Sequence, residues 1–257
     1  MKCEGKKVRL SDAPLECRND GHHLKARPSV DYSDCSECRG SGWIHKKGED
    51  GYEYVSPCAW GIIKSSVRMI EQAKMPGAYA SATISDFSGS KYASALKPAG
   101  EWLRTNPSQG GLWLYGGVGI GKTHLAVALA KAAAIRGVGP IWVDGPGLLQ
   151  SARNSFSNSD DPMGAAANAQ LLIIDDIDKI RSTEWVDEQI WLLLKTRCER
   201  NLATIVTANV RASEWCSRMT FGHPLLSRIR QNWSAVCLPG TDRRLEKENG
   251  RVVVCDA

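Results

Sequence analysis

The chain has 257 residues, of which 42% are hydrophobic and 24% charged, ordinary values for a globular protein that exclude wholesale disorder. The formal net charge of +5 is a mild basic excess spread along the chain, so charge alone indicates nucleic-acid binding only weakly. The N-terminus lacks an apolar signal region and no apolar run reaches the length of a membrane span, which predicts a cytoplasmic protein without a membrane partner.

Residues 1–60 are rich in Cys, Gly, Lys and acidic residues and show little periodicity, which predicts a small, loop-rich module. A helix is predicted over residues 61–74, where apolar residues recur near one face, and Met75-Pro76-Gly77 is expected to end it. A connector rich in Ser, Ala and Gly follows at 78–90, and a second helix is predicted over 92–104.

From Gly111 onward, predicted strands alternate with predicted helices. The strands are expected at residues 111–115, 141–143, 171–174, 203–207 and 235–238. The helices between them are expected at residues 122–136, 148–156, 183–200 and 224–231. Strands separated by helices predict an α/β fold with a five-stranded parallel sheet that carries helices on both faces.

A glycine-rich loop stands between the first of these strands and its helix. Residues 116–123 read GGVGIGKT and fit the pattern G-x-x-x-x-G-K-[ST]. Glycines let the backbone curl around phosphate oxygens, and the helix N-terminus adds partial positive charge. Lys122 is predicted to reach the β- and γ-phosphates of ATP, and the Thr123 hydroxyl to bind Mg²⁺. We assign nucleotide binding to Gly116, Gly117, Val118, Gly119, Ile120, Gly121, Lys122 and Thr123. An accidental glycine-rich turn is the alternative, and the agreement of motif and context argues against it.

The third predicted strand, LLII, ends in Asp175 and Asp176. We expect this strand beside the one that feeds the glycine-rich loop, so that its end lies near the bound metal. Asp175 is then predicted to hold Mg²⁺, and Asp176 to act as the general base that polarises the attacking water. Many such ATPases carry Glu at the second position, and the shorter Asp implies slow hydrolysis. Asp178 is expected to be a solvated helix-start residue, and a polar turn is the alternative reading of the acidic pair.

Polar residues in two further places are candidates for sensing the γ-phosphate. Asn209 follows the fourth strand, where its amide can bond the attacking water or the γ-phosphate, although Asn is also a common turn residue. Arg228 and Arg230 lie on the helix before the fifth strand, where an Arg can reach the nucleotide of a neighbouring subunit. A solvated helix face is the alternative for both arginines.

Four segments in order resemble the AAA+ ATPases of the initiator and helicase-loader clade, most closely the DnaC and DnaI type of replicative helicase loader. They are GGVGIGKTHL at 116–125, LLIIDD at 171–176, TIVTAN at 204–209 and SRIR at 227–230. The resemblance covers residues 78–238. It implies that His124 belongs to the nucleotide site, that Asn209 is the first sensor, and that Arg228 is the better finger candidate. Only residues 239–257 follow the fifth strand, too few for a full helical lid, and Arg243 and Arg244 are not assigned the role of its second sensor.

Five of the nine cysteines lie before residue 60, which suggests a metal site in a chain whose compartment keeps thiols reduced. Cys35 and Cys38 form a C-x-x-C knuckle that suits tetrahedral Zn²⁺, and Cys58 follows at a normal distance for a third ligand. Cys17 is our choice for the fourth ligand. Cys3, His22, His23 and His45 stay open as alternatives. A redox pair and a coincidence in a Cys-rich chain are competing readings.

These observations predict a zinc-binding, partner-interaction module with a linker helix at residues 1–77 and an AAA+ ATPase domain at 78–257. The resemblance implies an ATP-dependent loader that oligomerises, contacts a replicative DNA helicase and single-stranded DNA, and hydrolyses ATP to release the helicase. An ATPase subunit of DNA transposition, of the IstB type, and an ATP-binding switch with negligible turnover are the alternatives. Residues of the cysteine module that offer a nucleic-acid contact instead are Trp43, Lys46, Lys47 and Tyr52.

Overall fold

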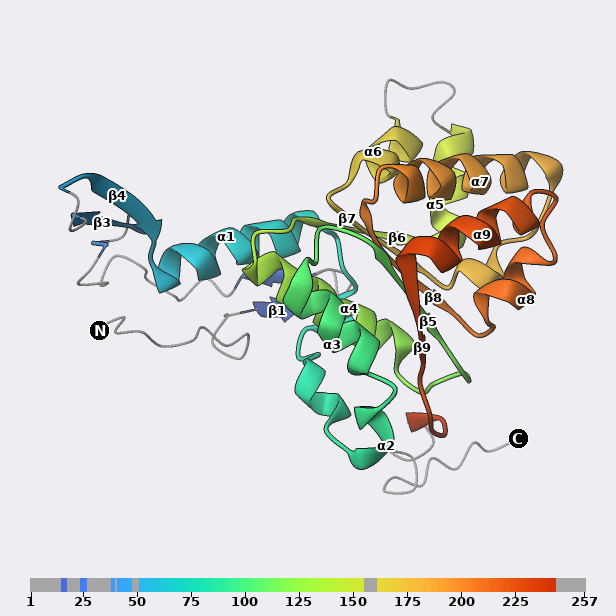
Figure 1. Ribbon diagram of the computed structural model, residues 1–257, viewed down its shortest axis with the longest axis horizontal. Coiled ribbons are helices and arrows are strands. Elements are labelled where there is room, and N and C mark those ends of the chain that lie inside the picture. Colours follow the sequence, from blue (N-terminus) through green and yellow to red (C-terminus); the bar gives the residue numbers. More distant parts are fainter. Residues whose placement is uncertain are drawn as a thin grey trace, which may run out of the picture.

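The computed structural model describes residues 15–17, 24–26, 38–39, 41–47, 51–154 and 161–243. Its main body is a parallel β-sheet between two layers of helices (Figure 1). The strands are β5 (Gly111–Tyr115), β6 (Pro140–Asp144), β7 (Leu171–Asp175), β8 (Ala203–Ala208) and β9 (Trp233–Cys237). They pair in the order β6-β7-β8-β5-β9, and every pair is parallel. The predicted α/β fold with a five-stranded parallel sheet is confirmed.

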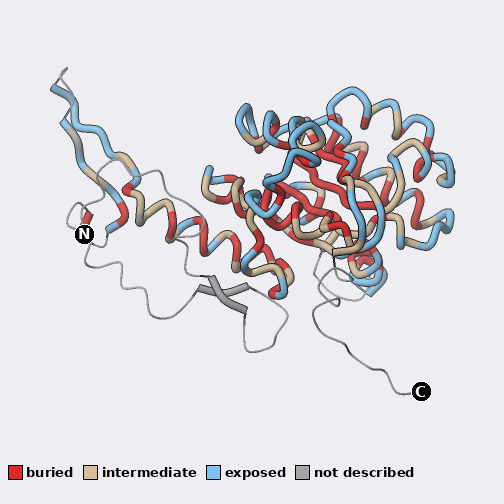
Figure 2. Tube along the Cα trace, turned by 90° about the horizontal axis from the view of Figure 1, so that it is seen from below, coloured by how far each residue is buried: buried red, intermediate tan, exposed pale blue. Residues whose placement is uncertain are grey.

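Both faces of the sheet are covered. One face carries α1 (Ala59–Gln72), α3 (Lys97–Thr105) and α4 (Lys122–Ile135). The other face carries α5 (Gly145–Asn154), α6 (Pro162–Asn168), α7 (Glu184–Glu199), α8 (Ala212–Cys216) and α9 (Gly222–Asn232). Successive residues of a strand point to opposite faces, so Leu112 and Leu114 join the first core and Trp113 joins the second. Figure 2 shows the buried residues concentrated in the sheet and on the helix sides that face it.

The order of the strands differs from expectation at one place that matters for the site. The strand with the acidic pair, β7, does not lie beside β5, because β8 is inserted between them. The registers pair Leu171 with Ala203 and Gly111 with Thr204. The carboxyl end of β8 therefore stands between the glycine-rich loop and the acidic pair, and its polar residues reach both.

Several helices also differ from expectation. The helix predicted over 92–104 is two helices, α2 (Ser90–Ala93) and α3, because Pro98 has no N–H to donate and begins a new helix instead. The connector predicted at 78–90 contains two short 3-10 helices, η2 (Gly77–Tyr79) and η3 (Ile84–Phe87). Helices α6 and α8, which the sequence did not predict, are only one or two turns long.

The N-terminal region contains two antiparallel hairpins, where loops were expected. Strand β1 (Leu15–Cys17) pairs with β2 (Leu24–Ala26), and β3 (Trp43–Lys47) pairs with β4 (Glu53–Pro57). Helix α1 projects from the body and carries the second hairpin at its N-terminal end (Figure 1). The buried face of α1, with Ile63, Val67 and Ile70, belongs to the same core as α4.

Three further expectations concern the chain as a whole. Among the described helices, none is both long and apolar enough to cross a membrane. Residues 244–257 lie outside the described residues, so the lack of a full helical lid stays a prediction. The domain boundary between residues 77 and 78 also stays a prediction.

Candidate nucleotide-binding site

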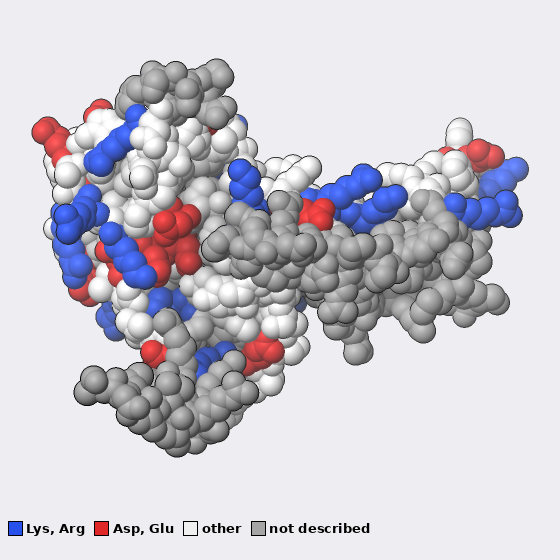
Figure 3. Space-filling model, turned by 180° about the vertical axis from the view of Figure 1, so that it is seen from behind, with Lys and Arg blue, Asp and Glu red and all other residues white. Residues whose placement is uncertain are grey.

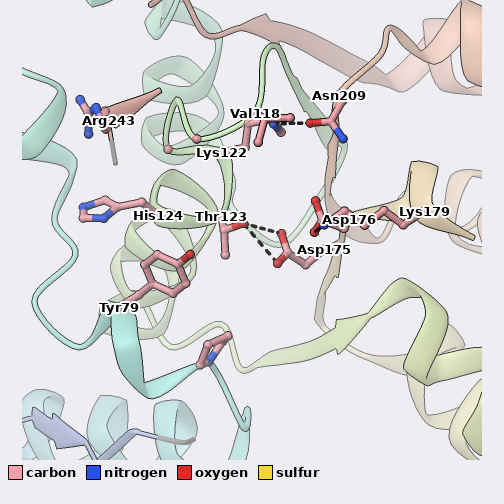
Figure 4. Close-up of a pocket in the computed structure, with 13 residues that line it drawn as sticks. Tyr79, Val118, Lys122, Thr123, His124, Asp175, Asp176, Lys179, Asn209 and Arg243 are labelled. Atoms are coloured by element: carbon pink, nitrogen blue, oxygen red, sulfur yellow. Dashed lines mark hydrogen bonds and ion pairs between the residues drawn. The ribbon is translucent and has the colours of Figure 1, made fainter. Parts of the chain in front are cut away.

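A cavity of about 480 Å³ opens at the carboxyl edge of the sheet. Its walls come from the segment before the sheet, the glycine-rich loop, the ends of β7 and β8, and the chain after β9 (Figure 4). The residues that line it are Pro76, Tyr79, Val118, Gly119, Gly121, Lys122, Thr123, His124, Asp175, Asp176, Lys179, Asn209 and Arg243. Ligands of parallel α/β sheets bind at this edge, in the crevice outside the strand ends.

The glycine-rich loop follows β5 and ends where α4 begins at Lys122. Gly119 and Gly121 have positive φ angles of 71° and 102°, a region that residues with a Cβ atom rarely occupy. The N-terminus of the 14-residue helix α4 points into the cavity, with its free N–H groups and partial positive charge. The loop and helix together form an anion site of the kind that holds phosphates.

Lys122 is nearly buried, with 7% of its surface exposed. Its Nζ donates to Gly116 O at 3.1 Å, to Gly117 O at 2.7 Å and to Asn209 Oδ1 at 2.8 Å. Burial lowers the pKa of its ammonium group, while Asp176 and the neighbouring acids act in the opposite direction. The ammonium group therefore lies among neutral oxygens that phosphate oxygens can replace when a nucleotide binds.

Asp175 sits at the end of β7, opposite the loop. Its carboxylate accepts from Thr123 Oγ1 at 3.0 and 3.2 Å and from Thr207 Oγ1 at 2.6 Å. Burial raises the pKa of Asp175 to about 6, and the hydrogen bond from Thr207 opposes that shift. A hydroxyl and a carboxylate side by side are hard oxygen ligands of the kind that Mg²⁺ takes, so Thr123 and Asp175 fit a magnesium ion.

Asp176 turns the chain sharply after β7. It has a left-handed backbone with φ 54° and ψ 46°, a region that Asp enters more readily than most residues. Its backbone N–H donates to Thr207 Oγ1 at 2.8 Å, and its carboxylate pairs with Lys179. The carboxylate lines the cavity, where a water molecule can be oriented against a phosphate. Its role as general base stays a prediction.

Asn209 connects two charged groups of the site. Its Oδ1 accepts from Lys122, and its Nδ2 donates to Asp178 Oδ2 at 2.8 Å. The expectation that Asp178 is solvated was wrong, because the insertion of β8 beside β7 brings Asn209 to it. The other oxygen of Asp178, Oδ1, is buried and has no hydrogen-bond partner among the described residues. Asp178 is thus part of the polar network under the site.

Aromatic and charged side chains close the opposite end of the cavity. His124, which the resemblance implied, lines it, and its Nε2 lies 2.7 Å from Asp86 Oδ2. The imidazole meets the ring of Tyr79 edge to face, with 6.0 Å between centroids. Flat apolar surface of this kind suits an adenine base. Neither Tyr79 nor Asp86 was predicted, because a connector carries no motif that indicates its place in space.

Arg243 also reaches this cavity, from the chain after β9 (Figure 4). Its backbone N–H donates to Gly119 O at 3.1 Å, and its guanidinium donates to Tyr92 Oη at 3.0 Å. The guanidinium lies 4.5 Å from the centroid of Phe87. Sequence reasoning named Arg243 but did not assign it, because nothing local places residue 243 beside the loop.

The predicted finger residues lie elsewhere. Arg228 is on α9, where its guanidinium lies 3.4 Å from Glu199 Oε1 and 3.3 Å from Pro224 O. Arg230 is exposed on the same helix. Neither lines the cavity of its own chain. Of the predicted loop residues, Ile120 is buried beneath the loop rather than at the cavity wall.

The structure brings together two of the four predicted zinc ligands. Cys38 and Cys58 are buried with their sulfur atoms 3.3 Å apart, next to Ile44. Zn–S bonds of about 2.3 Å in a tetrahedron place sulfur atoms about 3.8 Å apart, so the pair needs little movement. Cys35 and the side chain of Cys17 lie outside the described residues, and the described part of the chain contains no group of three metal-ligating residues. The zinc site stays a prediction.

Comparison with known families identifies the class of protein to which this site belongs. The family described as IstB-like ATP binding protein matches residues 89–248, more than half of the chain. The chain belongs to the IstB-like ATP binding protein family. The matched segment runs from α2 past β9 and therefore contains the loop, the acidic pair, Asn209 and Arg243.

The replicative helicase loader DnaI of Bacillus subtilis (strain 168) is 27% identical over 147 residues, which cover 52% of this chain and 47% of DnaI. The match thus spans about half the length of this curated relative. The DnaC helicase loader is similar in structure, with TM-score 0.56 and 24% identity over 63% of this chain and 99% of that chain. A DnaI structure has TM-score 0.57 and 24% identity over 64% of this chain and 95% of that chain. The resemblance to AAA+ proteins of the DnaC and DnaI type is confirmed.

Proposed function

We propose that this protein is an ATP-dependent loader of a replicative DNA helicase, which binds ATP and Mg²⁺, oligomerises, contacts the helicase and single-stranded DNA, and hydrolyses ATP to release the helicase. One observation carries the proposal: Lys122, Thr123 and Asp175 converge on one cavity of nucleotide size. The fold around this cavity is similar to that of the helicase loaders DnaC and DnaI.

In the proposed reaction, the triphosphate of ATP lies on the glycine-rich loop with Lys122 Nζ at its terminal oxygens. Mg²⁺ held by Thr123 and Asp175 would neutralise charge that develops on the phosphates. Asp176 takes a proton from the attacking water, which bonds to the γ-phosphorus while the bond to the bridging oxygen breaks and ADP leaves. Lys179 pairs with Asp176 Oδ2 and competes with the water for this carboxylate, which favours slow turnover.

The placement of the arginines supports an oligomer. An arginine finger stabilises the phosphoryl group that is being transferred. An arginine that lies away from the nucleotide site of its own chain can do so only at the site of a neighbouring copy. Arg228 stands on α9 outside its own cavity and has only an exposed glutamate as ion-pair partner among the described residues. We assign Arg228 to the ATP of a neighbouring copy, with Arg230 as the second choice.

The cysteine region contributes a separate part of the proposal. Residues 1–77 form the partner-interaction module and 78–257 the ATPase domain. Cys17, Cys35, Cys38 and Cys58 would hold Zn²⁺, and the proximity of two of these thiols supports the assignment. A tetrahedral zinc ion would staple a segment that has little core of its own.

A second function is favoured by the family itself. IstB-like proteins give the family its description, and an ATPase subunit that assists DNA transposition would use the same nucleotide site. An ATP-binding switch with negligible turnover is the third reading, which the pairing of Asp176 with Lys179 supports.

Co-purification with the replicative helicase of the same organism, with and without ATP, tests the proposal. A complex is expected from the full chain and is expected to weaken when Lys122→Ala removes ATP binding. Arg104→Gln, on exposed α3 surface, is the matched control and should leave the complex unchanged. No complex at any nucleotide state, together with ATP-dependent filaments on DNA, would favour the transposition reading.

A further inference from the structure

A second cavity, of about 530 Å³, lies where the β3–β4 hairpin meets α1 and the C-terminal end of α4. The described residues that line it are all different from those that line the nucleotide site. We propose that this groove binds single-stranded nucleic acid, with basic side chains on its phosphates and Trp43 stacked on a base. The inference rests on the proposed function, in which the protein contacts single-stranded DNA, and it names the surface that makes this contact.

Three cations converge on the groove. Lys64 and Arg68 come from α1, and Arg136 comes from the end of α4. None of the three forms an ion pair with a described residue, and no acidic residue is among those described that line the groove. Figure 3 shows Lys and Arg side chains gathered along the arm that α1 and the hairpin form. Cations in a groove whose described lining holds no acid give a positive potential that attracts a phosphate backbone.

The face of α1 that lines the groove is set by helix geometry. Gly61, Lys64, Ser65 and Arg68 are spaced three and four residues apart, so they share one side of the helix. The opposite side packs on α4 with Ile63, Val67 and Ile70. The first turn of α1 adds its partial positive charge at the hairpin end, where no side chain caps it.

The hairpin extends the groove with aromatic and basic groups. Trp43 pairs with Pro57, and both line the groove, so the next residues on that face are His45 and Lys47 of β3. Trp43 is 53% exposed, although an indole normally lies buried, and His45 and Lys47 are exposed as well. A bare aromatic ring beside cations is the combination that single-stranded nucleic acid uses for stacking and phosphate contact.

The groove is preformed, because the hairpin sits directly on α1. The backbone N–H of Cys58 donates to Gly42 O at 2.9 Å. A Cβ atom on Gly61 would lie 2.2 Å from the same oxygen, so only glycine permits this contact. Trp43, next to Gly42, is therefore held at a fixed place relative to Lys64 and Arg68.

Trp43 favours nucleic acid over an acidic protein segment, the other class of ligand that these cations would attract. An acidic protein segment would use Lys64, Arg68 and Arg136 in the same way, but it has no base to stack on an indole. A nucleotide strand uses both kinds of group, and its phosphate contacts release counterions on binding.

The test is fluorescence anisotropy of a labelled oligothymidylate with the full chain across a salt series. Lys64→Gln/Arg68→Gln/Arg136→Gln is expected to weaken binding about tenfold or more and to lower the salt slope by about 2, since each phosphate contact contributes about 0.7. Trp43→Ala is expected to weaken binding about tenfold, and Trp43→Phe to restore most of it. Lys91→Gln/Lys97→Gln/Arg104→Gln, exposed on α2 and α3, is the matched control and should bind like the wild type.

Three results would overturn the proposal: no binding by the wild type at low salt, no effect of the groove variants, or equal binding of labelled poly-glutamate with no effect of Trp43→Ala. Nucleotide binding measured on every variant shows that the fold is intact. If the groove variants lose oligothymidylate binding and the wild type forms no helicase complex, the groove assignment stands and the loader function is rejected. If the wild type loads the helicase and the groove variants bind DNA normally, the loader function stands and the groove assignment is rejected.

Discussion

Asn209 Nδ2 donates to Asp178 Oδ2 at 2.8 Å, and this bond determines which end of the Asn209 amide faces Lys122. Asp178 touches neither the cavity nor the loop among the described residues. We therefore expect Asp178 to position Asn209, the predicted sensor. The second oxygen of Asp178 is buried without a partner among the described residues, which costs the folded state free energy.

Asp178→Ala is expected to lower the ATP turnover number about tenfold while ATP affinity changes little, because the Asn209 amide loses its orientation. Stability is expected to change little, because the removal of the buried Oδ1 atom offsets the loss of the hydrogen bond from Asn209. Asp178→Asn keeps an acceptor oxygen and should retain more activity. Steady-state kinetics, nucleotide titration and urea unfolding measure the three quantities. A parallel loss of stability and affinity would mean that Asp178 is merely structural.

Thr123→Val removes the hydroxyl that bonds Asp175 while keeping the shape of the side chain. Nucleotide binding in EDTA is expected to stay close to that of the wild type. The gain in affinity on adding Mg²⁺ is expected to fall about tenfold, because one hard oxygen ligand is lost. Titration of a fluorescent ATP analogue with and without Mg²⁺ measures this, with Ser65→Ala, on exposed α1 surface, as control. An unchanged Mg²⁺ dependence would place the metal elsewhere.

Arg228→Ala is expected to bind ATP normally and to lose about a thousandfold in hydrolysis, because the finger is supplied to a neighbouring copy. Lys122→Ala is inactive for another reason, since its own site cannot hold ATP. Mixing the two inactive variants should restore part of the activity, with an intact site on one chain facing an intact arginine on the other. Arg230→Ala in the same mixture tests the second candidate. Absence of recovery with either arginine would contradict a finger acting between subunits.

Lys131 provides a pH test that is independent of the nucleotide site. It is 2% exposed and donates to Ala80 O and Ala82 O, and burial lowers its pKa to about 8. The unfolded chain binds this proton more tightly, so stability is expected to rise as the pH goes from about 8 to 10.5. The full effect is roughly 3 kcal/mol. Urea unfolding across this range should show the rise in the wild type and a flatter curve in Lys131→Met.

Zinc content tests the cysteine module. The purified chain is expected to contain one Zn²⁺ per chain by elemental analysis, released by a mercurial reagent. Cys38→Ser and Cys58→Ser are each expected to lose it, while Cys237→Ser, an exposed cysteine at the far side of the sheet, should keep it. Chelation is expected to lower helicase binding and to leave ATP binding intact. A full zinc complement in the Cys58→Ser variant would remove Cys58 from the ligand set.

The features that could be predicted from sequence are those with a local signal. The loop at 116–123 is defined by its glycines, and each strand of the sheet by a short apolar run between turns. The end of β7 needed only the change from apolar residues to Asp175 and Asp176. These elements lie where they were expected, within a few residues.

The features that were missed depend on pairings between distant segments. Strand β8 pairs with both β5 and β7. The hydrophobic periodicity of the sequence predicts where a strand lies in the chain, but it does not predict which strands pair. The placement of β8 brings Asn209 to Asp178 and Thr207 to Asp175, so neither contact was foreseen. Strands β6 to β9 all lie between Gly119 and Arg243 in sequence, yet the two residues share a hydrogen bond.

The hydrogen bond from Arg243 N–H to Gly119 O has a consequence for how the protein is made. The walls of the nucleotide cavity come from Tyr79, before the first strand of the sheet, and from Arg243, after the last. A growing chain on the ribosome cannot complete this pocket until Arg243 has emerged. We therefore expect nucleotide capture to be a late event in synthesis, and a chain truncated after β9 to hold ATP less tightly than the full chain.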